Sequence, residues 1–152
     1  MTHFKARPTV YKGIQMRSRL EAGFAAWLDK FDMTWKYEPR AFASENGQYL
    51  PDFELPEIDF IGTPPAQVFV EIKPAQPDPD VLSLQRSIIK ESLPDAQLVV
   101  VWPDRDRYRT MLIGDGFWDV MIWTVRTPRR LALDVEASNG PWHGDYWKPR
   151  PS

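Results

Sequence analysis

The stretch that most constrains the fold of this chain is residues 68–73, which read VFVEIK. Successive side chains of a β-strand point to opposite faces of the sheet. The alternation therefore predicts a strand with an apolar face of two valines and an isoleucine, and a second face that carries Glu71 and Lys73. Because the apolar face must be buried against another layer, we expect this strand inside a sheet.

A second strand is predicted over residues 49–55, which read YLPDFEL. If the two strands pair antiparallel, Asp52 lies beside Glu71 on the face that also carries Lys73, and two adjacent carboxylates suit a hard divalent cation such as Mg²⁺. The alternative is an exposed charged pair worth less than about 1 kcal/mol. Pro51 has no backbone N–H to donate to a neighbouring strand, so it predicts that this strand lies at the edge of the sheet or contains a bulge.

A helix is expected to begin near Ser18. Apolar side chains recur at three- and four-residue spacing over residues 20–31, which is typical of an amphipathic helix packed on a sheet. Ser18, followed three residues later by Glu21, matches a capping box. Glu21 therefore has two interpretations that the residues alone leave open. Its carboxylate bonds the backbone amide of Ser18, or it faces the strand carboxylates from the first turn of the helix.

The remaining elements are predicted from apolar runs and turn residues. Fifteen prolines leave little room for long helices. We expect a strand at 34–38, a helix at 81–93 with Val81 and Leu84 among its apolar positions, a strand covered on both faces at 98–102, and a β-hairpin of strands 108–113 and 118–125 around the turn at 114–116. The predicted organisation is an N-terminal arm at 1–15, a single domain at 16–136 with its core at 16–102, and a tail rich in Trp and Pro at 137–152.

Composition indicates a cytoplasmic protein that does not enter a membrane. The chain has 152 residues, enough for one domain with a buried core, and it contains no cysteine. No apolar run approaches the length of a membrane span, and the N-terminus lacks the apolar segment of a signal peptide.

The charge balance does not by itself indicate a nucleic-acid-binding protein. The formal net charge is −2, whereas such proteins normally carry a basic excess. The distribution matters more than the sum, because several basic clusters on one side would attract phosphates. Gln85 and Arg86, on the helix predicted at 81–93, are placed to reach a nucleic-acid backbone; the alternative is that they are ordinary solvated residues.

The order of these elements and acids resembles the PD-(D/E)xK nuclease superfamily over residues 17–102. The motif residues are Pro51-Asp52, Glu71-Ile72-Lys73 and, on the helix, Glu21. The longer series, MRSRLE at 16–21, YE at 37–38, YLPDF at 49–53 and FVEIK at 69–73, looks most like phage junction-resolving endonucleases and transposon-end nucleases. The resemblance implies an α/β fold with a restriction-endonuclease-like αβββαβ core, a mixed central sheet flanked by helices, and a C-terminal β-hairpin and extended tail.

The resemblance also implies a separate role for each of the site residues. Asp52 and Glu71, with the backbone carbonyl of Ile72, would hold Mg²⁺, for which Mn²⁺ is a usual substitute. Glu21 would steer the metal shell or support a second ion. Lys73 would orient the attacking water and offset the charge that builds on the phosphate.

The implied activity is metal-dependent hydrolysis of DNA phosphodiester bonds by an endonuclease, with branched DNA such as a Holliday junction as one substrate. Arg17 and Arg19, at the helix start, would receive DNA phosphates, and a homodimer would allow two strands to be cut. Two alternatives stay open. One is a non-catalytic DNA-binding or assembly subunit with a nuclease fold, and the other is a nuclease active only within a larger recombination or transposition complex.

Overall fold

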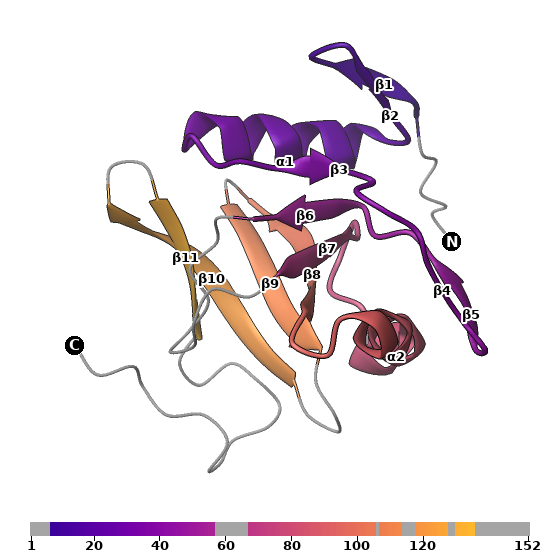
Figure 1. Cartoon of the computed structure of the whole chain (residues 1–152). Helices are drawn as coiled ribbons and strands as arrows, with labels where there is room; N and C mark the ends of the chain where they lie inside the picture. Colours follow the sequence, from indigo (N-terminus) through magenta and orange to yellow (C-terminus); the bar gives the residue numbers. More distant parts are fainter. Residues whose placement is uncertain (1–6, 57–66, 106, 114–117, 128–129, 136–152) are drawn as a thin grey trace, which may run out of the picture.

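The computed structural model describes residues 7–56, 67–105, 107–113, 118–127 and 130–135 (Figure 1). It is a mixed α/β structure built on a seven-stranded sheet of order β11-β10-β9-β8-β7-β6-β3. The sheet strands are β3 (Lys36–Tyr37), β6 (Phe53–Leu55), β7 (Val68–Ile72), β8 (Gln97–Asp104), β9 (Arg107–Ile113), β10 (Trp118–Thr127) and β11 (Arg130–Val135). Only β7 and β8 pair in parallel, and the other neighbours are antiparallel, so the predicted mixed central sheet is confirmed.

Two helices cover opposite faces of this sheet. The helix α1 (Arg19–Lys30) packs its buried side chains, among them Phe24 and Leu28, against Val70 of β7 and other residues of the same face. The helix α2 (Ser83–Ser92), which follows the 3₁₀ turn η1 (Pro79–Leu82), packs on the alternate side chains of β7 and β8. Figure 1 shows the two helices on either side of the sheet. In the described part of the chain, no helix is both long enough and apolar enough to cross a membrane.

The start of α1 lies where the sequence predicts it. Ser18 is the N-cap, with an extended backbone, and its hydroxyl accepts a hydrogen bond from the backbone N–H of Glu21 at 3.1 Å. This bond satisfies one of the free amides of the first turn. The helix ends at Lys30, within one residue of the predicted end.

The single strand predicted over residues 49–55 is wrong. Tyr49 ends β5 (Gly47–Tyr49), which pairs with β4 (Phe42–Ser44) in a separate two-stranded sheet, and Phe53 begins β6. Pro51 lies in the break, where its missing N–H removes no ladder bond. The two predicted alternatives, an edge position and a bulge, are wrong as well, because β6 lies between β7 and β3 and its described pairing with β7 has no shift of register. The antiparallel pairing of β6 with β7 is confirmed, with Phe53 opposite Val70.

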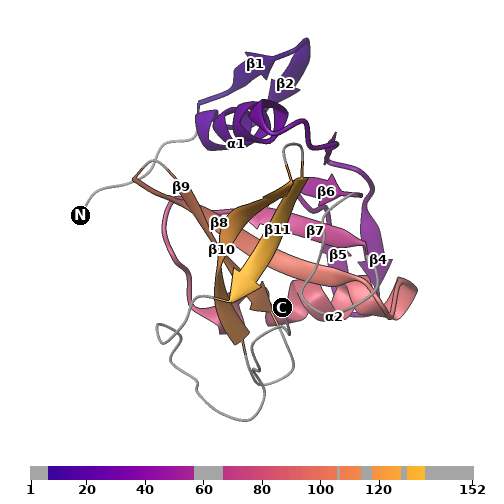
Figure 2. The same ribbon diagram turned by 90° about the vertical axis from the view of Figure 1, so that its left-hand side faces the viewer.

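The predicted N-terminal arm contains a hairpin. Its strands β1 (Thr9–Tyr11) and β2 (Ile14–Met16) are joined by Lys12 and Gly13, both in the left-handed region at φ values of 50° and 78°. Two such residues in a row are typical of a tight two-residue hairpin turn. Figures 1 and 2 show this hairpin on α1, away from the central sheet. Residues 1–6 lie outside the described residues.

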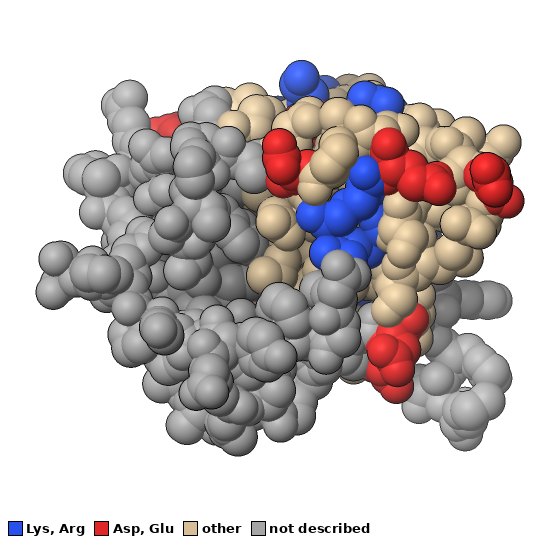
Figure 3. Space-filling view, turned by 60° about the horizontal axis from the view of Figure 1, so that its bottom comes forward, with Lys and Arg blue, Asp and Glu red and all other residues tan. Residues whose placement is uncertain are grey.

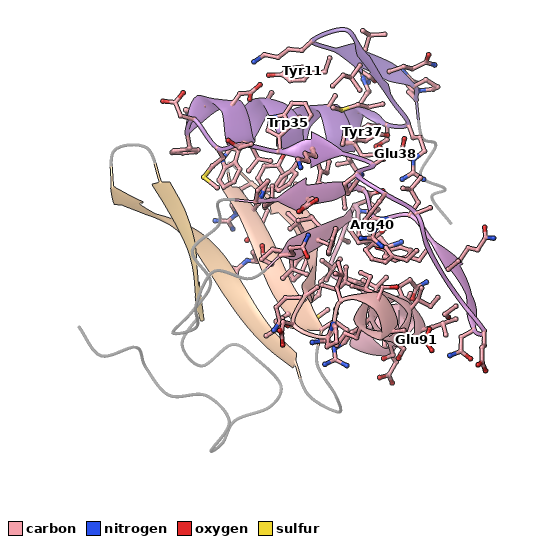
Figure 4. All side chains as sticks on the ribbon, viewed as in Figure 1. Tyr11, Trp35, Tyr37, Glu38, Arg40 and Glu91 are labelled. Carbon is pink, nitrogen blue, oxygen red and sulfur yellow. The ribbon has the colours of Figure 1, made fainter. Side chains whose placement is uncertain are left out.

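Asp29 fastens the hairpin to α1. Its carboxylate accepts hydrogen bonds from the Tyr11 hydroxyl at 2.6 Å and from the Trp35 indole Nε1 at 2.9 Å, and it pairs with Lys12 Nζ at 2.9 Å. Figure 4 labels Tyr11, in the hairpin, and Trp35, in the chain that leads into β3. One helical carboxylate therefore joins α1 to the hairpin and to the chain that leads into β3.

The later elements follow the predictions in part. The run at 98–102 is confirmed as a strand buried on both faces, within β8. The hairpin of β9 and β10 is confirmed, and β11 adds a further strand that was not predicted. On η1 and α2, Val81 and Leu84 are exposed instead of buried, at 55% and 50%, because Leu82, Ile88 and Ile89 form the covered face. The turn at 114–116 and the tail at 137–152 lie outside the described residues.

Candidate active site

Asp52 lies at the point where the chain enters β6, and it is 2% exposed. Its backbone N–H donates to the carbonyl of Val70 at 3.0 Å, and its side-chain Oδ2 accepts from the backbone N–H of Ile72 at 2.8 Å. Phe53 is opposite Val70, so the same antiparallel register places Asp52 opposite Glu71. The predicted approach of these two carboxylates is therefore present.

Glu71 is held by two neighbours on its own face of the sheet. Its Oε1 accepts a hydrogen bond from the Tyr49 hydroxyl at 2.5 Å, and its Oε2 lies 3.7 Å from Lys73 Nζ. The Lys73 backbone N–H donates to the carbonyl of Val101 at 2.9 Å, which fixes this lysine beside β8. Burial, followed by the charge of Glu71, raises the pKa of the Tyr49 hydroxyl far above its ordinary value, so the phenol stays a donor.

The Asp52 carboxyl has a strongly perturbed acidity. Burial is the largest cause and the charge of Glu71 the second, and together they raise the pKa of Asp52 to about 8. Glu21 acts in the same direction. The Ile72 N–H and the Arg17 guanidinium act in the opposite direction because both favour the charged form. The negative charges of Glu71 and Glu21 that raise this pKa also favour a positive group beside Asp52.

Glu21 belongs to this group of acids. Its carboxylate does not complete a capping box with the Ser18 amide: Oε1 accepts from the Tyr37 hydroxyl at 2.5 Å and from the backbone N–H of Arg17 at 3.3 Å. The residue is 6% exposed, and its charge contributes to the raised pKa of Asp52. The Glu21 carboxylate therefore does not take the capping interpretation; it is bound by Tyr37 and Arg17 and lies near enough for its charge to act on Asp52, while the Glu21 backbone N–H still makes the cap.

Arg17 reaches three of the surrounding carboxylates. Its guanidinium contacts Asp52 Oδ1 directly, and its Nε lies 3.4 Å from Glu38 Oε2 and 3.9 Å from Glu21 Oε1. Partial burial lowers the pKa of Arg17, but the hydrogen bond with Tyr37 and the carboxylates raise it by more, so the net shift is upward. The Arg17 side chain is still 58% exposed. We call Glu21, Glu38, Asp52 and Glu71 together the acidic site.

The other residues predicted to contact DNA are placed differently. Arg19 is exposed on the first turn of α1. Arg86 Nε donates to the carbonyl of Ile113 at 3.0 Å, so it fastens α2 to the end of β9. Gln85 is half-buried, and its Oε1 has no hydrogen-bond partner among the described residues. Contact of these three residues with DNA stays a prediction.

Three residues of the site were missed by the sequence reasoning. Tyr37 and Tyr49 each donate to one carboxylate, and Glu38 holds Arg17. Figure 4 shows Tyr37 and Glu38 next to each other where β3 ends. A usable signal existed, because all three residues stand in the segments YE at 37–38 and YLPDF at 49–53 on which the resemblance depends.

The donors of the acidic site fit a hard divalent cation through a pair of carboxylates. Among the described residues, no group of three or more His, Cys, Asp or Glu is arranged to hold a metal ion. Asp52 and Glu71 are two oxygen donors on neighbouring strands, and Mg²⁺ is commonly held by one or two carboxylates with water and phosphate in the other positions. The Arg17 guanidinium on Asp52 shows that this carboxyl accepts a positive partner.

Comparison of the chain with protein-family models, with curated proteins and with solved structures found no match. The structure shows a mixed α/β fold with an acidic site in which Asp52 and Glu21 are buried, and what this site does is a matter for proposal.

Proposed function

We propose that this chain is a metal-dependent DNA endonuclease with a restriction-endonuclease-like core. The observation that carries the proposal is the meeting of Asp52, Glu71 and Lys73 at the paired strands β6 and β7, with Glu21 facing them from the first turn of α1. The resemblance of the motif series to PD-(D/E)xK nucleases assigns the same residues to phosphodiester hydrolysis.

In this proposal Asp52 and Glu71 hold Mg²⁺, with the carbonyl of Ile72 as the third protein ligand. Bound there, Mg²⁺ would polarise a phosphate oxygen and lower the pKa of a bound water. The Ile72 N–H fixes Asp52, and the Tyr49 hydroxyl fixes Glu71, so both carboxylates are oriented before any ligand arrives.

Lys73 is the positively charged side chain that acts on the substrate phosphate in the proposed site. Its ammonium lies 3.7 Å from Glu71, and about a third of its side chain is exposed, so it can reach a phosphate while it stays next to the carboxylates. A compact ammonium there orients a water and offsets the negative charge that develops on the phosphate.

A second candidate function is a DNA-binding or assembly subunit that does not cut. Both Asp52 oxygens already have partners within the chain, and the net charge is negative. Figure 3 shows one group of Lys and Arg side chains with Asp and Glu on either side, so the charge on that face is mixed. A subunit of this kind would bind DNA through a small basic surface.

Cleavage assays with the purified chain separate these functions. Four-way junctions, linear duplex, single-stranded DNA and RNA are incubated with Mg²⁺ or Mn²⁺ and compared with EDTA. We expect cleavage of DNA that is lost in Asp52→Asn and Lys73→Met and kept in Asp95→Asn, which makes the same charge change at an exposed position. Intact substrates under all conditions would refute an enzyme that acts alone. Cleavage restored by a partner protein would then identify a nuclease that needs a larger complex.

A further inference from the structure

The Arg17 guanidinium places a positive charge inside the acidic site without any ligand. It contacts Asp52 directly, and its Nε lies within 4 Å of both Glu21 and Glu38. Most ion pairs of this kind lie on open surface, where they contribute little. Here Asp52 and Glu21 are almost fully buried, at 2% and 6% exposure, so solvent screens them little and a nearby cation interacts with them more strongly than on open surface.

The two oxygens of Asp52 are engaged in different ways. Oδ2 accepts from the Ile72 N–H at 2.8 Å, a backbone group fixed by the pairing of β7 with β8. Oδ1 is engaged by Arg17, a long side chain that is 58% exposed. A divalent ion approaching Asp52 can therefore displace Arg17 without disturbing the sheet, whereas it cannot displace the backbone N–H.

Glu38 is fixed in a position to receive the displaced guanidinium. Its backbone N–H donates to the carbonyl of Asp52 at 2.8 Å, and its φ is 44°, in the left-handed region that non-glycine residues seldom adopt. Such a conformation persists only where the surrounding structure imposes it. Its carboxylate, at 3.4 Å from Arg17 Nε, is more exposed than that of Asp52.

We propose that Arg17 is an internal cation that occupies Asp52 until a divalent ion replaces it, and that Glu38 is a positioning residue that keeps the displaced Arg17 beside the site. This inference rests on the proposed function, since it needs a divalent ion as the competitor. Once displaced, the guanidinium is held next to the bound ion with its donors free for a phosphate of the substrate, a bidentate contact to which arginine is suited. Arg17 would then couple metal binding to substrate binding.

Direct titration with Mn²⁺ alone, followed by the electron paramagnetic resonance of free Mn²⁺, tests the competition without any assay of cleavage. Loss of a charged hydrogen-bonding competitor in Arg17→Gln should tighten Mn²⁺ binding about tenfold. Arg19→Gln removes the same charge two residues away and should change the affinity by less than about twofold, because exposed charges are screened. Circular dichroism of each variant confirms that the fold is kept.

A double-mutant cycle tests the role of Glu38. Glu38→Gln should weaken Mn²⁺ binding when Arg17 is present, because the displaced guanidinium loses its acceptor. In the Arg17→Gln background, Glu38→Gln should weaken Mn²⁺ binding less, because only the negative charge of Glu38 is then lost. Equal effects in the two backgrounds would overturn the positioning role of Glu38.

A second readout follows Arg17 itself. In ¹⁵N spectra the Nε–H signal of Arg17 should shift on saturation with Mg²⁺ in the parent protein and stay unchanged in Asp52→Asn. Equal Mn²⁺ affinity in the parent and in Arg17→Gln would overturn the internal-cation role and leave metal-dependent cleavage standing. Absence of Mn²⁺ binding in both folded proteins would overturn the proposed function, and this inference with it.

Discussion

The Asp52 carboxyl is expected to make the stability of the protein depend on pH in a defined direction. Burial and the charge of Glu71 raise its pKa to about 8, from 3.8 for an ordinary aspartate. The unfolded chain therefore releases this proton at a lower pH than the folded chain does. The stabilisation is fully present below pH 3.8 and is lost as the pH rises through about 8, so the free energy of unfolding falls across this window.

The size of the effect follows from the two pKa values. Between pH 5 and pH 9, a group with these values in the unfolded and folded chains lowers the free energy of unfolding by about 4 kcal/mol. Solvent screening reduces this figure little, because Asp52 is 2% exposed. Asp52→Asn removes the titration while its side-chain oxygen can still accept from the Ile72 N–H.

Urea unfolding of the parent protein and of Asp52→Asn, measured in EDTA at several pH values from 5 to 9, tests this reasoning. The parent should lose stability relative to the variant by several kcal/mol as the pH rises. Asp95→Asn, an exposed change of the same kind, should follow the parent at every pH. Parallel curves for the parent and Asp52→Asn would refute the idea that this buried carboxyl is held protonated by its surroundings.

Two further predictions concern single hydrogen-bonding groups. Asp29→Asn should lower the free energy of unfolding by about 1–2 kcal/mol, because Asp29 joins the β1–β2 hairpin to α1 through charged hydrogen bonds; hydrogen exchange should speed up in the hairpin amides, and unchanged exchange would contradict the contact. Tyr49→Phe removes the hydroxyl that donates to Glu71 and should cost about 1–2 kcal/mol in urea unfolding. A neutral result at Tyr49 would mean that this bond does not hold Glu71.

The parts of the fold that the sequence predicted are those fixed by local chemistry. Ser18 starts α1 because its hydroxyl caps the first turn, and the alternation in residues 68–73 places β7 with its charged face toward Asp52. The alternation also limits the pairing of β6 with β7, since a register slipped by one residue would turn one apolar face away from α1.

The errors arise where tertiary packing overrides local pattern. The run at 49–55 looks continuous, yet Tyr49 and Phe53 lie in different sheets, because the chain turns at Pro51 from the β4–β5 hairpin into the central sheet. This break also explains why Tyr49 was missed: its hydroxyl reaches Glu71 from a strand outside the central sheet. The β1–β2 hairpin was missed because its turn depends on left-handed backbone at Lys12, a residue that rarely adopts it.

Several of the places where local rules are broken lie around the acidic site, although others, such as the left-handed Lys12 and the buried Glu54, lie elsewhere. A proline interrupts the approach to β6, Glu38 adopts a left-handed backbone, and Asp52 and Glu21 are acids buried to a degree that carboxylates seldom reach. The left-handed backbone and the buried acids each lower stability, and the Glu38 N–H bonded to the Asp52 carbonyl links two of these features directly. Unfavourable features that gather at one position are expected where function requires them, since a stable core alone would be better served by apolar side chains. The cost in stability at Asp52 therefore supports the cation-binding role proposed for the acidic site.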